Sequence, residues 1–104
     1  METRVNQNSL AAYLAHIERS YTGNATGKSR LFAKTEFGQK YIRVVIEYMG
    51  RRECHSFIVD KPDEIFSTGT ILKAAQWKAP AVNFARGHID DPNSYKLHTW
   101  MGGF

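Results

Sequence analysis

The sequence predicts an α+β domain in which an N-terminal helix is followed by an antiparallel sheet of about four strands and a short C-terminal helix. Three observations lead to this prediction. Residues 9–21 repeat their apolar side chains with the period of a helix, residues 30–60 alternate with the period of strands, and the connections between those strands are short. Helices packed on one face of an antiparallel sheet are one of the few stable layered arrangements.

The N-terminal helix is indicated by a single apolar stripe. Its members follow the spacing i, i+3, i+4, i+7, i+11, and they are Leu10, Tyr13, Leu14, Ile17 and Tyr21. Asn8 or Ser9 can cap the first turn, because a short side-chain oxygen accepts from an unpaired backbone N–H. Gly23 is expected to end the helix in the left-handed conformation. Residues 1–8 are polar and are expected to be flexible.

Three strands are predicted next, in the stretches "RLFAKTEF", "KYIRVVIEY" and "RECHSFIVD". Alternating β-branched and polar residues suit a pleated sheet that is buried on one face. The second and third strands are separated only by a hairpin tip at residues 49–51, so they are expected to be antiparallel. The third strand has an ambiguous facing, since Phe57 and Val59 compete with Cys54 and Ile58 for the buried side.

The second half of the chain holds shorter predicted elements. Residues 70–77, "TILKAAQW", indicate a fourth strand, and residues 79–87, "APAVNFARG", indicate a short helix. Pro80 suits the first position of that helix, and Gly87 suits the position just after its end. "DDPNS" predicts a turn, and residues 95–104 are expected to form a last strand or an ordered tail.

Length and composition describe one globular domain over residues 1–104. The 42% hydrophobic and 23% charged residues are ordinary values for such a domain. The single Cys54 excludes an internal disulfide and a CxxC metal knuckle. The N-terminus lacks a signal-peptide pattern, and no apolar run approaches the ~20 residues of a membrane helix. We therefore expect a soluble, cytoplasmic protein.

One segment, "KAAQWKAPAVNFARGH", concentrates positive charge in a chain with a net charge of +4 and a pI of about 9.4. A helix that begins at Pro80 would offer unpaired N–H groups to an anion. Lys73, Lys78 and Arg86 could then contact phosphates while a base stacks on Trp77. The alternative reading is that Trp77 is buried in the core and that the three cations are only a solvated rim.

The predicted hairpin carries a second basic group. Arg51 and Arg52 lie at its tip, Arg43 lies on the exposed face of one strand, and Phe32 and Lys34 lie on that of the neighbouring strand. Cations interleaved with aromatic rings on a sheet are a known way to hold nucleic acid. Charged outer faces also simply keep sheets soluble, and the sequence leaves both readings open.

Catalytic and metal-binding patterns are weak. Cys54 and His55 are adjacent in a strand, so their side chains point to opposite faces, and a dyad would need a histidine from elsewhere in the fold. His88, Asp90 and Asp91 are possible metal ligands, but "DDPN" is equally a turn signature. We expect no enzymatic activity, no metal and no cofactor.

Residues 70–88, "TILKAAQWKAPAVNFARGH", resemble a segment of small uncharacterised accessory proteins encoded by bacteriophages. The resemblance covers about a fifth of the chain and depends on the order Trp77, Lys78, Pro80, Arg86, Gly87. It implies a phage source and the cytoplasm of a host cell, and it implies no reaction.

These observations lead to three functional hypotheses. The first is a nucleic-acid-binding module with little sequence preference, which uses Lys73, Trp77, Lys78 and Arg86 with support from the hairpin arginines. The second is a protein-interaction or inhibitor module that binds a host or phage protein or forms a homodimer through a sheet edge. The third is a pocket for a small anionic nucleotide at the start of the predicted short helix.

Overall fold

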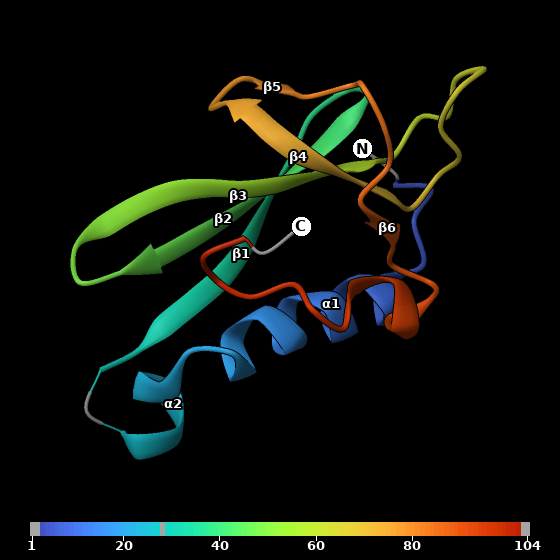
Figure 1. Cartoon of the computed structure of the whole chain (residues 1–104). Coiled ribbons are helices and arrows are strands. Elements are labelled where there is room, and N and C mark those ends of the chain that lie inside the picture. The colour runs from blue at the N-terminus through green and yellow to red at the C-terminus, as the bar shows by residue number, and fades with distance from the viewer. Residues whose placement is uncertain (1–2, 28, 103–104) are drawn as a thin grey trace.

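The computed structural model describes residues 3–27 and 29–102. Its elements, in chain order, are α1 (Gln7–Arg19), α2 (Thr22–Thr26), β1 (Leu31–Phe37), β2 (Tyr41–Tyr48), β3 (Arg51–Val59), β4 (Thr70–Gln76), β5 (Ala79–Pro80), β6 (Gly87–His88) and the 3-10 helix η1 (Pro92–Tyr95). Figure 1 shows α1 and the C-terminal segment together on one side of the sheet. The α+β class predicted from the sequence is confirmed.

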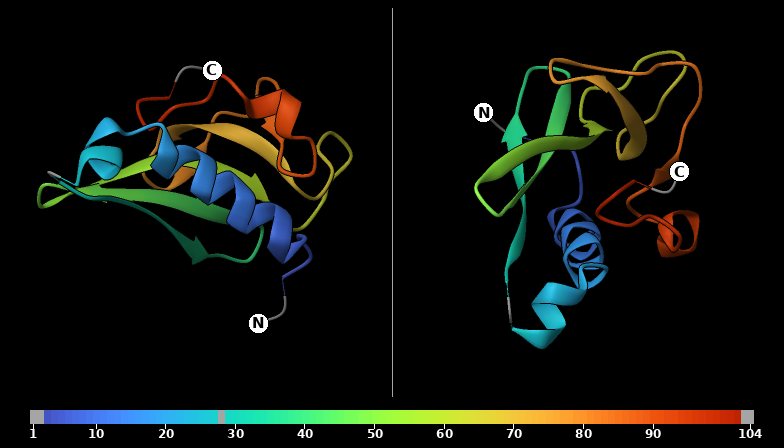
Figure 2. Two further views of the ribbon diagram at one scale, coloured as in Figure 1. Left: turned by 90° about the horizontal axis from the view of Figure 1, so that it is seen from below. Right: turned by 60° about the vertical axis from the view of Figure 1, so that its left-hand side comes forward.

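The sheet is an antiparallel meander of β1, β2, β3 and β4, and the short strands β5 and β6 both pair with β4. The turn between β2 and β3 has positive φ at Met49 (49°) and Gly50 (75°). A two-residue turn with positive φ at both positions fits the right-handed twist of the two strands that it connects. Figure 2 shows the resulting twist, with β4 rotated away from β1 across the sheet.

The main hydrophobic core lies between the sheet and α1. The helix contributes Leu10, Tyr13 and Ile17, which share one face because they are three and four residues apart. The sheet contributes alternate residues of its strands, namely Leu31, Ala33, Ile42, Val44, Ile46, Ile58 and Ile71. The predicted apolar stripe and the predicted alternation therefore meet in one core.

The opposite face of the sheet is covered only in part. Phe57, Val59 and Leu72 form a second, smaller cluster there, over which Phe66 of the loop before β4 packs. This loop covers the β3–β4 side of that face. No helix in the described part of the chain covers the β1–β3 side, as Figure 1 shows, and this side carries charged and aromatic residues.

A β-bulge explains the ambiguous facing of the third strand. Val44 pairs with Ser56 whereas Val45 pairs with Cys54, so His55 is the extra residue. The insertion shifts the alternation by one position. Cys54 and Phe57 therefore lie on the same face although they are three residues apart, and Ile58 lies on the other.

The short helix predicted over residues 79–87 is absent, and this prediction was wrong. Pro80 pairs with Ala74 as part of β5, and the backbone N–H groups of Ala81 and Arg86 donate to the carbonyls of Lys73 and Ile71 at 2.7 Å each. The edge of β4 therefore takes the backbone groups that a helix would have used. A helix of about two turns is marginal without packing, so the sheet edge prevails.

The helix ends also differ from the prediction. Asn6 caps α1, because its side-chain oxygen accepts from the N–H groups of Asn8 and Ser9. The left-handed residue is Gly27, at the end of α2, and not Gly23. The first difference arises because Asn6, Asn8 and Ser9 are similar capping residues within three positions, and the second because Gly23 lies inside the short helix α2, which was not predicted from the sequence.

The chain ahead of α1 is held in place around Val5, although residues 1–8 were expected to be flexible. Val5 is buried, and the N–H groups of Arg4 and Val5 donate to the Asp60 carboxylate at 2.6 and 3.3 Å. Met1 and Glu2 lie outside the described residues.

Three imidazoles attach the C-terminal segment to the core. His16 Nε2 donates to the carbonyl of His98 at 2.9 Å, and His55 Nε2 donates to that of Thr99 at 2.7 Å. His98 Nε2 donates to the carbonyl of Arg86 at 2.9 Å. A carbonyl can only accept, so each Nε2 carries the proton. The segment is thus fixed by side chains where it has little strand pairing.

The second ring nitrogens of two of these histidines face buried hydroxyls. His55 Nδ1 accepts from Ser56 Oγ at 2.9 Å, and His98 Nδ1 accepts from the Tyr13 hydroxyl at 3.3 Å. Burial lowers the pKa of both histidines, that of His98 to about 4. They are therefore neutral at pH 7, as the hydrogen-bond pattern requires.

Candidate nucleic-acid interface

The candidate site is the face of β1, β2 and β3 that is turned away from α1, which we call the open face. The residues that alternate with the core positions point to it. Cross-strand pairs place Phe32 beside Glu47, Glu36 beside Arg43, and Glu47 beside Arg52. Phe32 is 43% exposed. The open face therefore presents an aromatic ring among alternating charges.

Trp77, which follows β4 directly, lies over this face. The Arg43 guanidinium is 4.8 Å and the Arg52 guanidinium 5.4 Å from the centroid of its ring. Arg43 Nε also donates to the Trp77 carbonyl at 2.7 Å, which fixes the backbone at this point. Trp77 is 37% exposed, so the residue remains partly accessible although two arginines contact its ring.

The arginines are themselves held by carboxylates. Glu36 bonds to Arg43 and Arg52 at 2.7 Å each, and Glu47 bonds to Arg52 and Lys34 at 2.9 Å each. Hydrogen bonds from Arg52 and Arg43 lower the pKa of Glu36, and those from Lys34 and Arg52 lower the pKa of Glu47. Three cations and two carboxylates form one network with an excess of one positive charge.

Further cations flank the network at both ends of the hairpin. At the tip, a hollow of about 330 Å³ is lined by Arg30, Phe32 and Arg51, and the Arg30 guanidinium is 5.5 Å from the centroid of the Phe32 ring. At the other end, Lys78 lines a hollow of about 250 Å³. Within the described part of the chain, Arg30, Arg51 and Lys78 make no ion pair. Their charges are available to a ligand.

The structure divides the residues predicted from the sequence. It brings Trp77 together with Arg43 and Arg52, and it places Lys78 and Arg51 at the two ends of the same surface. Lys73 lies elsewhere, in a pocket beside His55 and Trp100. The segment 73–88 is thus not a continuous cationic strip.

Arg86 is also removed from the open face. Its guanidinium lies 3.9 Å from the centroid of the Phe84 ring, and its Nε is buried without a hydrogen-bond partner. Because the short helix is absent, the anion site expected at its start does not exist, and the third hypothesis is withdrawn.

Sequence reasoning missed the roles of Glu36 and Glu47. A signal for them was present: each lies directly opposite an arginine once the register of β1, β2 and β3 is known. Opposite charges at such positions attract one another. Neither pair lies across the bulge in β3, so the short turns between these strands already fixed both registers, and the pairs were missed because the strands were not aligned residue by residue.

The side chains considered for catalysis or metal binding are either protonated or hydrogen-bonded within the fold. Burial raises the pKa of the Cys54 thiol to about 11, so it is protonated at neutral pH. His88 Nε2 donates to the carbonyl of Thr68, and Asp91 caps the 3-10 helix by accepting from the Asn93 N–H. Among residues 3–27 and 29–102, no three His, Cys, Asp or Glu side chains gather as a metal site would require.

Comparison with known proteins adds no assignment: the chain matches no family model, no curated protein and no solved structure. None of the helices in the described part of the chain is long and apolar enough to cross a membrane.

Proposed function

We propose that this protein is a non-enzymatic module that binds single-stranded nucleic acid on the open face, with little sequence preference. The observation that carries the proposal is the exposure of two aromatic rings, Phe32 and Trp77, on a sheet face that also gathers six arginines and lysines. Sheet-type modules hold nucleic acid by stacking bases on such rings while cations contact the backbone.

The rings favour a single strand over a duplex. A base can lie flat on an exposed ring only when it is free of its neighbours in a duplex stack. Each such stack contributes about 1–3 kcal/mol and tolerates any base, because every base has a π face. Two rings on one surface therefore favour affinity without strong sequence readout.

The cations without ion pairs suggest a path for the sugar-phosphate backbone of the nucleic acid. Arg30 and Arg51 at the hairpin tip and Lys78 at the far end have no carboxylate partner among the described residues, whereas Arg43 and Arg52 are held by Glu36. We place the phosphates at the two ends and the bases over the rings between them. In this arrangement Arg43 and Arg52 lie against Trp77 and add positive charge between the two ends, an effect that their carboxylate partners reduce.

The alternative, a module that binds another protein or pairs with a second copy through a sheet edge, has less support. The first half of the β1 edge is occupied, because Leu31 exchanges backbone hydrogen bonds with the Asn24 side chain and the Ala33 N–H donates to Glu18. Only the end of the strand, around Thr35 and Phe37, remains for pairing with another chain. A short edge of this kind resists association.

The test is fluorescence anisotropy with a labelled single-stranded oligonucleotide of mixed sequence at several salt concentrations. Three phosphate contacts predict a slope of about −2 in a plot of log K against log salt. Lys78→Glu should weaken binding, whereas the matched control Lys96→Glu, which makes the same charge change on the C-terminal segment, should not. Size-exclusion chromatography of both variants reports the alternative: a dimer that binds no oligonucleotide would overturn the proposal.

A further inference from the structure

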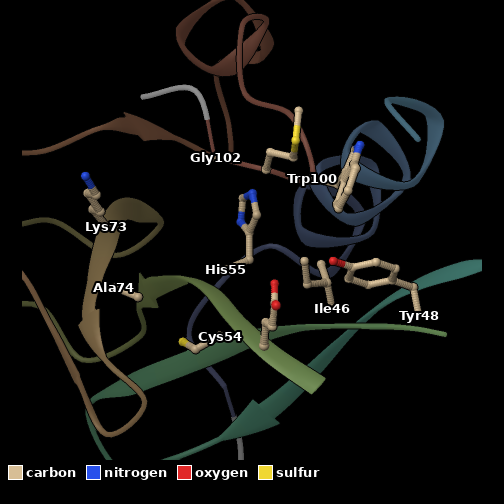
Figure 3. Close-up of a pocket in the computed structure, with 10 residues that line it drawn as sticks. Ile46, Tyr48, Cys54, His55, Lys73, Ala74, Trp100 and Gly102 are labelled. Carbon is tan, nitrogen blue, oxygen red and sulfur yellow. The ribbon is translucent and has the colours of Figure 1, made fainter. Parts of the chain in front are cut away.

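Another concave site lies between β3 and β4, beyond the last pair of their ladder, Ser56 with Lys73. It is a pocket of about 420 Å³ between β2, β3, β4 and the C-terminal turn. Its volume is in the range of small-molecule sites. Figure 3 shows Lys73 on one side of it, Trp100 and Tyr48 on the other, and His55 between them.

The aromatic wall of this pocket is preformed. The Trp100 ring meets the rings of Tyr48 and Tyr21 edge to face, at centroid distances of 5.1 and 5.2 Å. Its backbone N–H donates to Ser20 Oγ at 2.8 Å. Since His55 holds the neighbouring Thr99 carbonyl, the wall is fixed on both sides, and a ligand would not need to order it.

The polar residues of the pocket carry one charge of each sign. Lys73 and Glu53 both line it, and within the described part of the chain neither makes an ion pair. His55 adds no charge, because burial lowers its pKa and keeps it neutral. Cys54 is likewise a neutral thiol at neutral pH. The ligand therefore meets one ammonium group, one carboxylate and an aromatic wall.

We infer that this pocket binds a small amino-acid-like zwitterion with an aromatic or large apolar side chain. The carboxylate of such a ligand would pair with Lys73, its ammonium group with Glu53, and its side chain would lie against Trp100 and Tyr48. A ligand with a single charge would leave one of the two protein charges without a partner or facing a like charge. The juxtaposition of two unpaired opposite charges beside an aromatic wall thus selects a zwitterion.

The test follows the fluorescence of Trp100 in the full chain carrying Trp77→Phe, in which Trp100 is the only tryptophan. The probes are L-phenylalanine, 3-phenylpropionate, which lacks the ammonium group, and phenethylamine, which lacks the carboxylate. L-phenylalanine should give a saturable change at millimolar concentration, and each analogue should bind at least about ten-fold more weakly. Equal binding of the three probes, or no saturable change with L-phenylalanine, would overturn the inference.

Two charge reversals sharpen the test. Lys73→Glu should abolish the preference for L-phenylalanine and favour phenethylamine, and Glu53→Lys should favour 3-phenylpropionate. Both side chains are on the surface, so the variants should keep the circular dichroism spectrum of the parent. Lys96→Glu is the control and should leave all three affinities unchanged. An unaltered preference in Lys73→Glu would exclude a role for this ammonium group and so contradict the assignment.

Discussion

The two faces of β1, β2 and β3 are built from alternate residues of the same strands, yet they are stabilised in different ways. The face under α1 buries aliphatic side chains such as Ile42 and Ile46 completely or nearly so. The open face instead pairs charges across the strands and places Trp77 over two of them. Burial contributes far more free energy than exposed ion pairs do.

We expect this difference to separate the residues that stabilise the fold from those that would bind the proposed ligand. The buried face tolerates little loss of side-chain volume before the domain unfolds, because its side chains are close-packed. The open face can exchange partners at small cost, since phosphate can replace a carboxylate beside an arginine.

The buried face is tested by Ile58→Ala. Ile58 is fully buried in the core beneath α1, so the substitution should lower the free energy of unfolding by about 2–5 kcal/mol. Urea denaturation followed by circular dichroism measures the change. Phe32→Ala on the open face is the control and should cost much less. An equal decrease in the free energy of unfolding in the two variants would contradict the different roles of the two faces.

The attachment of the C-terminal segment is tested by pH. Burial lowers the pKa of His98 to about 4, whereas an unfolded chain has a histidine pKa of about 6.5. Between these values the unfolded state binds a proton that the folded state does not, so stability should fall as the pH drops from 6.5 to 4. The loss from this residue should be about 3 kcal/mol.

The control for this measurement is His98→Gln. Glutamine keeps an N–H donor for the Arg86 carbonyl but does not titrate. Its stability, measured by thermal unfolding, should depend less steeply on pH across the same window. A variant with the full slope of the parent would show that the loss arises from other groups.

The open face is tested by Trp77→Ala. Removing the indole should weaken single-strand binding by about 1–3 kcal/mol, which is the value of one stacked base. The free energy of unfolding should change little, because the ring is partly exposed. Leu97→Ala, a comparable truncation of an exposed side chain on the C-terminal segment, should leave the anisotropy titration unchanged. Unaltered affinity in Trp77→Ala would refute stacking at this ring.

The smallest effect is expected for Glu36→Gln. This change removes the carboxylate shared by Arg43 and Arg52 and frees their charge for phosphate. Oligonucleotide affinity at low salt should rise about two- to five-fold, with a steeper salt dependence. Thermal unfolding should move only slightly, as is usual for exposed ion pairs. A fall in affinity would mean that Glu36 is needed to orient the arginines and that phosphates do not reach them.

Much of the fold could be predicted because its signals are local. The apolar stripe from Leu10 to Ile17 has the period of a helix, and the alternation from Leu31 to Ile46 has the period of strands. Each period can be recognised within a few residues. The bulge at His55 has no such period, since one inserted residue shifts the alternation without any change in composition. The candidate site was predicted only in part, because Arg43, Arg52 and Trp77 are distant in sequence. Their contact depends on how β4 crosses the sheet.

The sequence by itself determined the helix, the order of the strands and the face of the first two strands that is buried, because side-chain periodicity acts over a few residues. The tertiary structure alone decided that residues 79–88 complete the edge of β4 and form no helix. It also decided that Lys73 and Trp77, four residues apart, serve different surfaces. Both outcomes depend on long-range backbone pairing and sheet twist, and these arise only when distant segments meet.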